Sequence, residues 1–278
     1  MITAADVQKA LVDQGRGPAA IWGSADTAIE QVIVCWSASA ATMSAAEHRS
    51  TVFVCRAHPF FASPAYFDPA EIMDEQGWLE RSVGDPVIAA KAAMLEGGTS
   101  AILWAPRLWD VDGPATRSQA FAEAGGFAIE RPDPDIGAVT AELPSTSFGE
   151  LLSRALPQWE VSRAFVMGNM KDHVTRVGFV AGVASPAELQ SLMLDPSIGG
   201  AFVGEVVEWE GAPFVVDAAA LGRPFALAAV GAAASEQFAG AAVADRLREL
   251  VPGADVRCEF LREASWPIDQ SADSSGRR

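Results

Sequence analysis

Three apolar segments of the sequence are each followed by a side chain that can bind a metal ion or transfer a proton. His58 follows VFVCRA, Asp110 comes shortly after SAILWA, and Glu236 follows PFALAAV and a turn of small residues. In α/β sheets the carboxyl ends of the strands face the ligand crevice. One imidazole and two carboxylates at such ends are a set from which a divalent metal site is commonly built.

Each of these side chains also has a simpler structural explanation. A lone histidine after a strand is more often a surface or hydrogen-bonded residue than a ligand. Asp110 and Asp112 fit a turn before a helix start at Pro114. Ser235 fits an N-cap with Glu236 in the first helical turn, where the helix dipole favours a carboxylate. Spacing alone leaves both explanations open.

Short apolar runs alternate with helical patterns along the chain, which predicts an α/β fold. The runs are continuously apolar, as expected for a parallel or mixed sheet that helices cover on both faces. The predicted strands are QVIVCWS, STVFVCR, SAILWA, RAFVMG, RVGFVAG, GAFVGE and PFALAAV. The predicted helices are AADVQKALVD, DPVIAAKAAMLEGG, PATRSQAFAEAGG, SFGELLSRAL, SPAELQSLML and SEQFAGAAVADRLRELVPG.

A change in composition around residues 131–148 predicts a lobe boundary. This stretch, RPDPDIGAVTAELPSTSF, is rich in Pro, Asp, Ser and Thr. We expect an N-terminal α/β lobe over residues 1–135, a C-terminal α/β lobe over 136–262 and a disordered tail over 263–278. The two lobes can exchange terminal elements.

Composition excludes several classes of partner. The formal net charge of −16 repels nucleic acid and anionic membranes, and no basic patch offsets it. The sequence has no apolar window of membrane-spanning length and no secretory h-region near its start. We therefore expect a cytoplasmic protein without nucleic-acid or membrane partners. Three cysteines with no CxxC pair indicate reduced, mostly buried thiols.

Familiar catalytic motifs are missing. The sequence contains neither GxxxxGK[ST] nor GxGxxG, so it lacks both common phosphate-binding loops. It also lacks the GxSxG of α/β-hydrolases and the HExxH of zinc proteases. The side chains at the strand ends are therefore the remaining candidates for a functional site.

Three segments resemble motifs of the Nif-three-like proteins, also called the dinuclear metal centre hexamer or GTP cyclohydrolase type 2-like family. The segments are Ala57-His58-Pro59, Pro106-Arg107-Leu108-Trp109-Asp110 and Gly231-Ala232-Ala233-Ala234-Ser235-Glu236. IGAVTAEL, RVGFVAG and AFVGEVVEWEGA between them also look similar, so the resemblance extends to about residue 260. It implies the short, two-lobed α/β form without an inserted domain, assembled as a homohexamer, a trimer of dimers.

The resemblance also implies a site for two metal ions with five ligands. Carried over by position, the ligands fall on Ala57, His58, Asp110, Ala232 and Glu236. Two ligand histidines are thus alanines, which donate no electron pair. The resemblance therefore implies at most one divalent ion, Mn, Fe, Zn or Mg, held by His58, Asp110 and Glu236, or none.

Three functions follow from this degenerate site. The first is a metal-dependent hydrolase, of cyclohydrolase or amidohydrolase type, that cleaves an amide-like or ring C–N bond in a small polar molecule. Its metal lowers the pKa of a bound water, and Glu205 or Asp112 acts as the general base.

The second function is a metal-free small-molecule enzyme. His58, Asp110 and Glu236 then transfer protons in a pocket that the alanines at 57 and 232 enlarge. The aromatic residues expected beside that pocket are Trp36, Phe60, Phe61 and Trp109. The third function is a non-catalytic hexameric binding or scaffold subunit.

Overall fold

The computed structural model describes residues 2–13, 20–46, 49–60, 85–110, 112–113, 115–130 and 137–260. Contacts divide the described chain into two units. The first comprises residues up to Thr116 together with Glu236–Phe260, and the second comprises Arg117–Ser235. This division differs from a boundary at 135/136, because residues 117–130 group with the second unit and the chain returns to the first at Glu236.

The first unit contains a mixed five-stranded sheet in the order β1-β4-β3-β2-β10. Its parallel strands are β2 (Gln31–Cys35), β3 (Thr51–Cys55), β4 (Ser100–Trp104) and β10 (Asp255–Glu259), and β1 (Ala20–Gly23) pairs antiparallel with β4. All residues of β2 and β3 are buried, as their continuous hydrophobicity predicts. The carboxyl ends of β2 and β3 lie side by side, because Cys35 is paired with Cys55.

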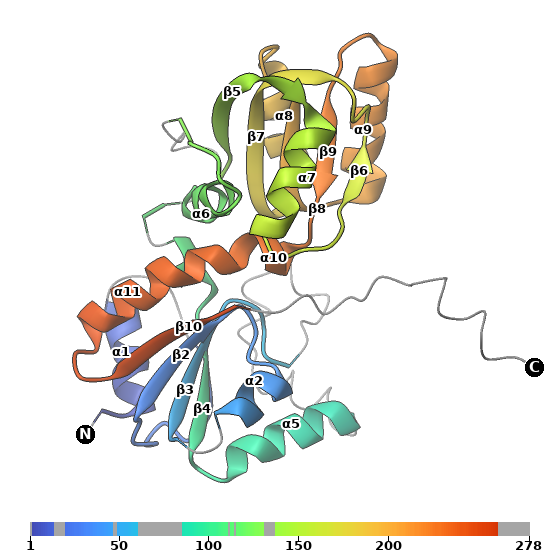
Figure 1. The fold of residues 1–278 in the computed structure, drawn as a ribbon. Coiled ribbons are helices and arrows are strands. Elements are labelled where there is room, and N and C mark those ends of the chain that lie inside the picture. Colours follow the sequence, from blue (N-terminus) through green and yellow to red (C-terminus); the bar gives the residue numbers. More distant parts are fainter. Residues whose placement is uncertain are drawn as a thin grey trace, which may run out of the picture. The chain divides into compact units, whose positions relative to one another are not determined.

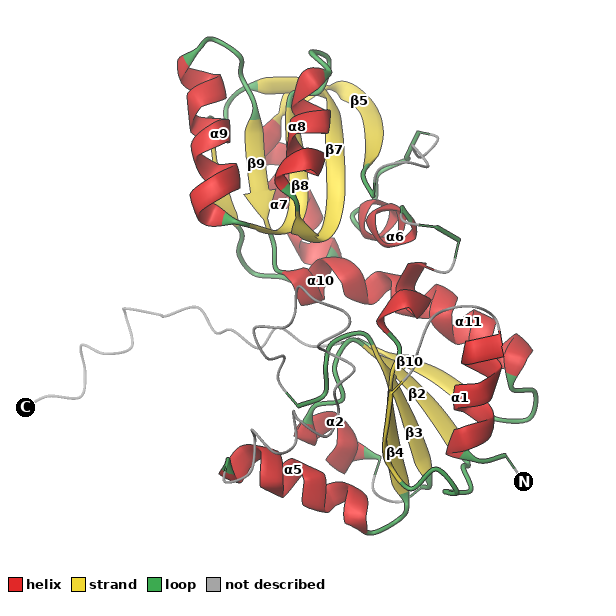
Figure 2. Ribbon diagram, turned by 180° about the vertical axis from the view of Figure 1, so that it is seen from behind, coloured by secondary structure: helices red, strands yellow, loops and turns green. Residues whose placement is uncertain are grey.

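Helices cover both faces of this sheet (Figures 1 and 2). The helices α1 (Ala4–Asp13) and α11 (Gly240–Leu250) lie on one face, and α2 (Ala40–Ala45) and α5 (Pro86–Glu96) lie on the other. On the second face Ile33, Phe53 and Ile102 pack with Met43 and Leu95 from these helices. Side-chain alternation along the strands thus divides the core into two layers.

The second unit contains another five-stranded sheet, in the order β5-β7-β8-β9-β6. Its central strands β7 (His173–Ala184), β8 (Gly200–Val206) and β9 (Ala226–Ala229) are parallel, and β5 (Val139–Ser147) and β6 (Phe165–Met167) form antiparallel edges. The helices α8 (Pro186–Leu194) and α9 (Glu208–Ala220) cover one face, and α7 (Phe148–Gln158) covers the other (Figure 2). A short helix α6 (Thr116–Ala124) precedes β5.

Aromatic side chains fill the layer between this sheet and α7. Phe148 of α7 stacks on Phe202 of β8 with ring centroids 4.6 Å apart, and Trp159 lies 5.4 Å from the same ring. Trp159 also donates a hydrogen bond to the carbonyl of Phe121 over 2.9 Å. Most tryptophan and phenylalanine side chains of this unit therefore serve packing rather than a pocket.

The predicted fold class is confirmed, and every strand and helix predicted from an apolar run has a counterpart among the described elements. The sequence patterns missed β1, β5, β10, α2 and α9. They also predicted one helix from Ser235 onward, where the structure has α10 (Ala232–Glu236), the 3-10 helix η3 (Gln237–Ala239) and α11. No described helix is both long and apolar enough to cross a bilayer. The three cysteines are free thiols.

Ser235 is not the N-cap that its sequence context predicts, because it lies inside α10. Its side chain is fully buried, and its hydroxyl oxygen accepts a hydrogen bond from the Gly182 N–H over 2.9 Å. The hydroxyl donates in turn to the Ala232 carbonyl over 2.9 Å. A Cβ on Gly204 would lie 2.3 Å from this hydroxyl, so glycine is required at that position. Ser235 therefore ties α10 to the bulge region of β7.

We expect Ser235→Ala to lower the free energy of unfolding by roughly 1–3 kcal/mol, because the buried Gly182 N–H would lose its acceptor. Urea denaturation followed by circular dichroism measures the loss. The control is Ser153→Ala on the exposed side of α7, where the hydroxyl only bonds the Gly149 carbonyl one turn earlier. Equal losses in the two variants would contradict the assigned role.

Candidate functional site

The carboxyl ends of β2 and β3 are held together just beyond their last ladder pair. The Trp36 carbonyl accepts hydrogen bonds from the N–H groups of Arg56 and Ala57 over 3.2 and 2.7 Å. The Trp104 indole at the end of β4 donates to the Arg56 carbonyl over 3.0 Å. Three neighbouring strand ends thereby fix the backbone from which Arg56, Ala57 and His58 project.

Glu236 is bound at these strand ends by two donors. Its carboxylate is buried, with Oε1 3.1 Å from Arg56 Nη2 and Oε2 2.9 Å from Trp36 Nε1. The Arg56 side chain is 19% exposed and that of Glu236 only 3%, so the pair is weakly screened by solvent. Each carboxylate oxygen therefore has a donor, and the guanidinium supplies a permanent counter-charge.

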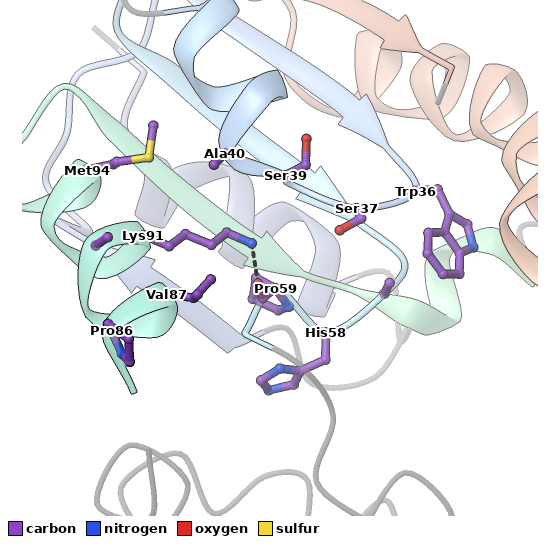
Figure 3. Close-up of a pocket in the computed structure, with 12 residues that line it drawn as sticks. Trp36, Ser37, Ser39, Ala40, His58, Pro59, Pro86, Val87, Lys91 and Met94 are labelled. Atoms are coloured by element: carbon purple, nitrogen blue, oxygen red, sulfur yellow. Dashed lines mark hydrogen bonds between the residues drawn. The ribbon is translucent and has the colours of Figure 1, made fainter. Parts of the chain in front are cut away.

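A cavity of about 710 Å³ opens beside the same strand ends (Figure 3). Its wall comes from the ends of β2 and β3, the start of α2 and one side of α5. The lining residues are Trp36, Ser37, Ser39, Ala40, Ala57, His58, Pro59, Pro86, Val87, Ala90, Lys91 and Met94. This volume falls within the range of small-molecule sites, which combine an apolar wall with a few polar groups.

His58 contributes a neutral imidazole to this wall. Its ring makes edge contacts with Trp22 and Trp104, each with ring centroids 5.2 Å away, and its Nδ1 accepts a hydrogen bond from the Phe60 N–H over 3.2 Å. Burial, and secondarily the charge of Lys91, lowers the pKa of His58 to about 4. The ring therefore offers a polar but uncharged surface near pH 7.

Three other expected site residues of the first unit, Asp110, Trp109 and Phe60, are not among the residues that line the cavity. Asp110 ends the 3-10 helix η2 (Pro106–Asp110), and Trp109 beside it is fully buried. Phe60 is buried behind the wall, and its ring lies 5.4 Å from Lys91 Nζ. Trp36 and Ala57, in contrast, belong to the wall of the cavity.

Two further expected residues belong to the second unit. Glu205 is an exposed residue of β8 whose carboxylate accepts a hydrogen bond from the Ala232 N–H over 3.4 Å. It therefore caps the N-terminus of α10, where the helix dipole favours a negative charge. Ala232 is the first residue of that helix. Phe61, which was expected beside the pocket, lies outside the described residues.

The residues present do not fit the two-metal centre that the resemblance implies. Ala57 and Ala232 offer no lone pair, and both oxygens of Glu236 already accept hydrogen bonds from Arg56 and Trp36. Across the described ranges, no three His, Cys, Asp or Glu side chains form a group that could hold a metal ion. The set of His58, Asp110 and Glu236 accordingly does not form such a group.

Sequence reasoning missed the residues that α2 and α5 bring to the cavity. Lys91, Val87 and Met94 lie on α5, and Ser39 is the N-cap of α2. No local motif marks them, because only the packing of α5 against the sheet turns one side of that helix toward the strand ends. The one available signal was Lys91 itself, the single basic residue of the largely apolar helix PVIAAKAAMLE.

We expect Arg56→Met to lower the free energy of unfolding by about 2–4 kcal/mol, because a buried carboxylate would lose its counter-charge. The matched control is Arg246→Met, which breaks an exposed pair with Glu249 and should cost about 1 kcal/mol or less. Urea denaturation at pH 7 compares the two variants. Similar losses in both would contradict the importance of the Arg56–Glu236 pair.

The pKa of His58 predicts an acid-sensitive contribution to stability. The unfolded chain binds a proton at this residue below its ordinary pKa of 6.5, whereas the folded protein binds it only below about 4. Stability is therefore complete above about pH 6.5 and falls by roughly 2 kcal/mol as the pH drops toward 4.

The measurement is the difference in unfolding free energy between the native protein and His58→Gln at pH 7 and at pH 4.5. Other titrating groups are common to both proteins and cancel in the comparison. The native protein should lose more stability than the variant on acidification. Parallel losses would show that His58 is readily protonated in the folded state.

Comparison with known proteins identifies the fold. No family model matches the sequence, and neither does any curated protein. Among solved structures, a Bacillus cereus protein related to NIF3 matches with a TM-score of 0.66 and 10% identity, over 96% of this chain and 99% of that one.

Two further structures agree. A hypothetical protein from Staphylococcus aureus matches with a TM-score of 0.66 and 11% identity, over 95% of this chain and 98% of its own. A protein from Thermus thermophilus matches with a TM-score of 0.60 and 14% identity, over 96% and 100%. The fold implied by the sequence motifs is therefore confirmed: over nearly its whole length this chain has the fold of the NIF3-related proteins.

Proposed function

We propose that this protein binds a small organic molecule, without a metal ion, in the cavity at the ends of β2 and β3. The observation that carries the proposal is the cavity itself, about 710 Å³ in volume, whose apolar wall includes the neutral imidazole of His58 and the amine of Lys91. Such a combination of apolar surface and a few polar groups is typical of ligand sites. Binding rather than hydrolysis is the function proposed.

The role proposed for Glu236 is positional. Its carboxylate accepts the Trp36 indole N–H, and Trp36 forms part of the cavity wall. Arg56 neutralises the same carboxylate. Glu236 thus orients a wall residue, whereas a proton-transfer role would require it to exchange a proton while paired with a guanidinium.

A one-metal hydrolase remains the competing proposal. The likeness of fold supports it, as does the presence of His58, Asp110 and Glu236 at positions that match the family motifs. Its chemistry would be cleavage of an amide-like or ring C–N bond by a metal-activated water. The engagement of both Glu236 oxygens by Arg56 and Trp36 weighs against it.

Metal analysis separates the two proposals. The native protein, His58→Ala and Glu236→Ala are purified without chelator, and their Mn, Fe, Zn and Mg contents are measured by mass spectrometry. Metal-independent binding predicts substoichiometric metal in all three proteins. About one equivalent in the native protein, lost in both variants, would overturn it in favour of the hydrolase.

Self-association as a homohexamer is a further part of the proposal. Its support is the fold likeness together with large apolar side chains exposed on and after α9. Trp209 is 80% exposed, Phe214 49% and Leu221 85%. Apolar surface of this kind commonly marks a protein interface.

We expect Ala90→Phe to abolish ligand binding, because the new ring would enter the cavity from the exposed side of α5. The matched control is Ala89→Phe, a neighbouring exposed position of the same helix that does not line the cavity. A fragment library of aromatic acids, amides and amines is screened by ligand-observed NMR against all three proteins. The proposal is wrong if no fragment binds the native protein, or if hits bind Ala90→Phe as well as Ala89→Phe.

A further inference from the structure

Among the described residues that line the cavity, Lys91 is the one with a charged side chain. It projects from α5 toward the end of β3, where its amine donates a hydrogen bond to the Pro59 carbonyl (Figure 3). Its Nζ also lies 5.4 Å from the centre of the Phe60 ring. The chain has 36 acidic residues against 20 lysines and arginines, yet in the described part of the chain no carboxylate pairs with this amine.

This environment leaves the charge of Lys91 incompletely compensated. The side chain is half-buried, and burial lowers the pKa of its amine. A carbonyl oxygen and an aromatic face stabilise an ammonium ion, but less than an anion does. A partly buried charge without a counter-ion is costly, so an anion bound in the cavity beside Lys91 would be stabilised by this charge.

The other lining residues favour the same class of ligand. The described residues that line the cavity include no aspartate or glutamate, so this part of the wall would not repel an anion. Ser37 and Ser39 add hydroxyl groups, and Trp36, Val87 and Met94 add apolar surface. A charged group beside an apolar wall selects molecules with one ionised end and a hydrophobic body.

We propose that the cavity takes an organic carboxylate, with its anionic end against Lys91 and its aromatic or aliphatic body against Trp36, Val87 and Met94. A carboxylate matches the single charge of one lysine. A phosphate monoester would bring about two negative charges near pH 7 and leave one uncompensated. This inference rests on the proposed binding function and names the ligand class of that site.

The test compares acids with their neutral amides of the same shape. Benzoate is paired with benzamide and naphthoate with naphthamide, and binding is measured by isothermal titration calorimetry at pH 7. The native protein is compared with Lys91→Met and with Lys9→Met, in which an exposed lysine of α1 is removed. Lys9→Met controls for the change in net charge.

We expect the native protein and Lys9→Met to bind at least one acid about 10- to 100-fold more tightly than its amide, as a hydrogen-bonded charge pair predicts. In Lys91→Met the acid should bind no better than the amide, while the affinity for the amide changes less than about threefold. If Lys91→Met does not fold, Lys91→Gln takes its place, and the comparison of acid with amide on the native protein needs no variant.

The outcomes separate this inference from the proposed function. Equal binding of acid and amide to the native protein, or a preference for the acid that persists without Lys91, overturns the inference and leaves the cavity as a neutral-ligand site. Absence of binding by any acid also overturns it. If, in addition, no fragment of the NMR library binds the native protein, the proposed binding function is also wrong.

Discussion

The charge pair between Arg56 and Glu236 is the interaction on which the candidate site depends. Arg56 follows β3, and Glu236 is the residue at which the chain re-enters the first unit after the whole of the second. The pair joins residues 180 positions apart in the sequence, and the Trp36 indole adds a contact across 200 positions. The ends of two parallel strands therefore hold the start of the returning segment through one buried carboxylate.

A guanidinium and a metal ion can both neutralise a buried carboxylate, but their consequences differ. A metal ion needs several donor atoms at fixed geometry and is lost when those donors are lost. An arginine is part of the chain, keeps its charge at every accessible pH and needs no further donors. Alanine at positions 57 and 232 is therefore compatible with an ordered Glu236, and Ala57 contributes instead to the cavity wall.

The sequence predicts buried elements of the fold better than exposed ones. The strands β2, β3, β4, β7 and β8 were predicted because they are largely buried and read as continuous apolar runs. The edge strands β1 and β10 are short and half-exposed, so they carry no such signal. The helix α9 contains Gly211 and Pro213, which obscured its helical pattern.

In the candidate site, residues at strand ends can be predicted from the sequence, whereas residues brought there by tertiary packing cannot. His58, Trp36 and Ala57 could be named as site candidates because they lie at the ends of predicted strands, where ligands bind in α/β folds. All three line the cavity. The pairing of Arg56 with Glu236 and the position of Lys91 depend on tertiary packing, which residue spacing does not reveal. The assignment of Ser235 as an N-cap was wrong because α10 already begins at Ala232, whereas the pattern indicated one helix that begins at Ser235.

The discontinuity of the first unit has a consequence for how the chain acquires its structure. The strand β2 reads QVIVC, and the partner on its outer edge is β10, the last described strand. During synthesis the residues 117–235 emerge as one contiguous segment, whereas the first sheet keeps an open, largely apolar edge until residue 259 has been made. Open apolar edges are templates for aggregation, and long-range pairing closes them slowly. Until β10 has been synthesised, the exposed edge of β2 is therefore a segment that a chaperone could protect from aggregation.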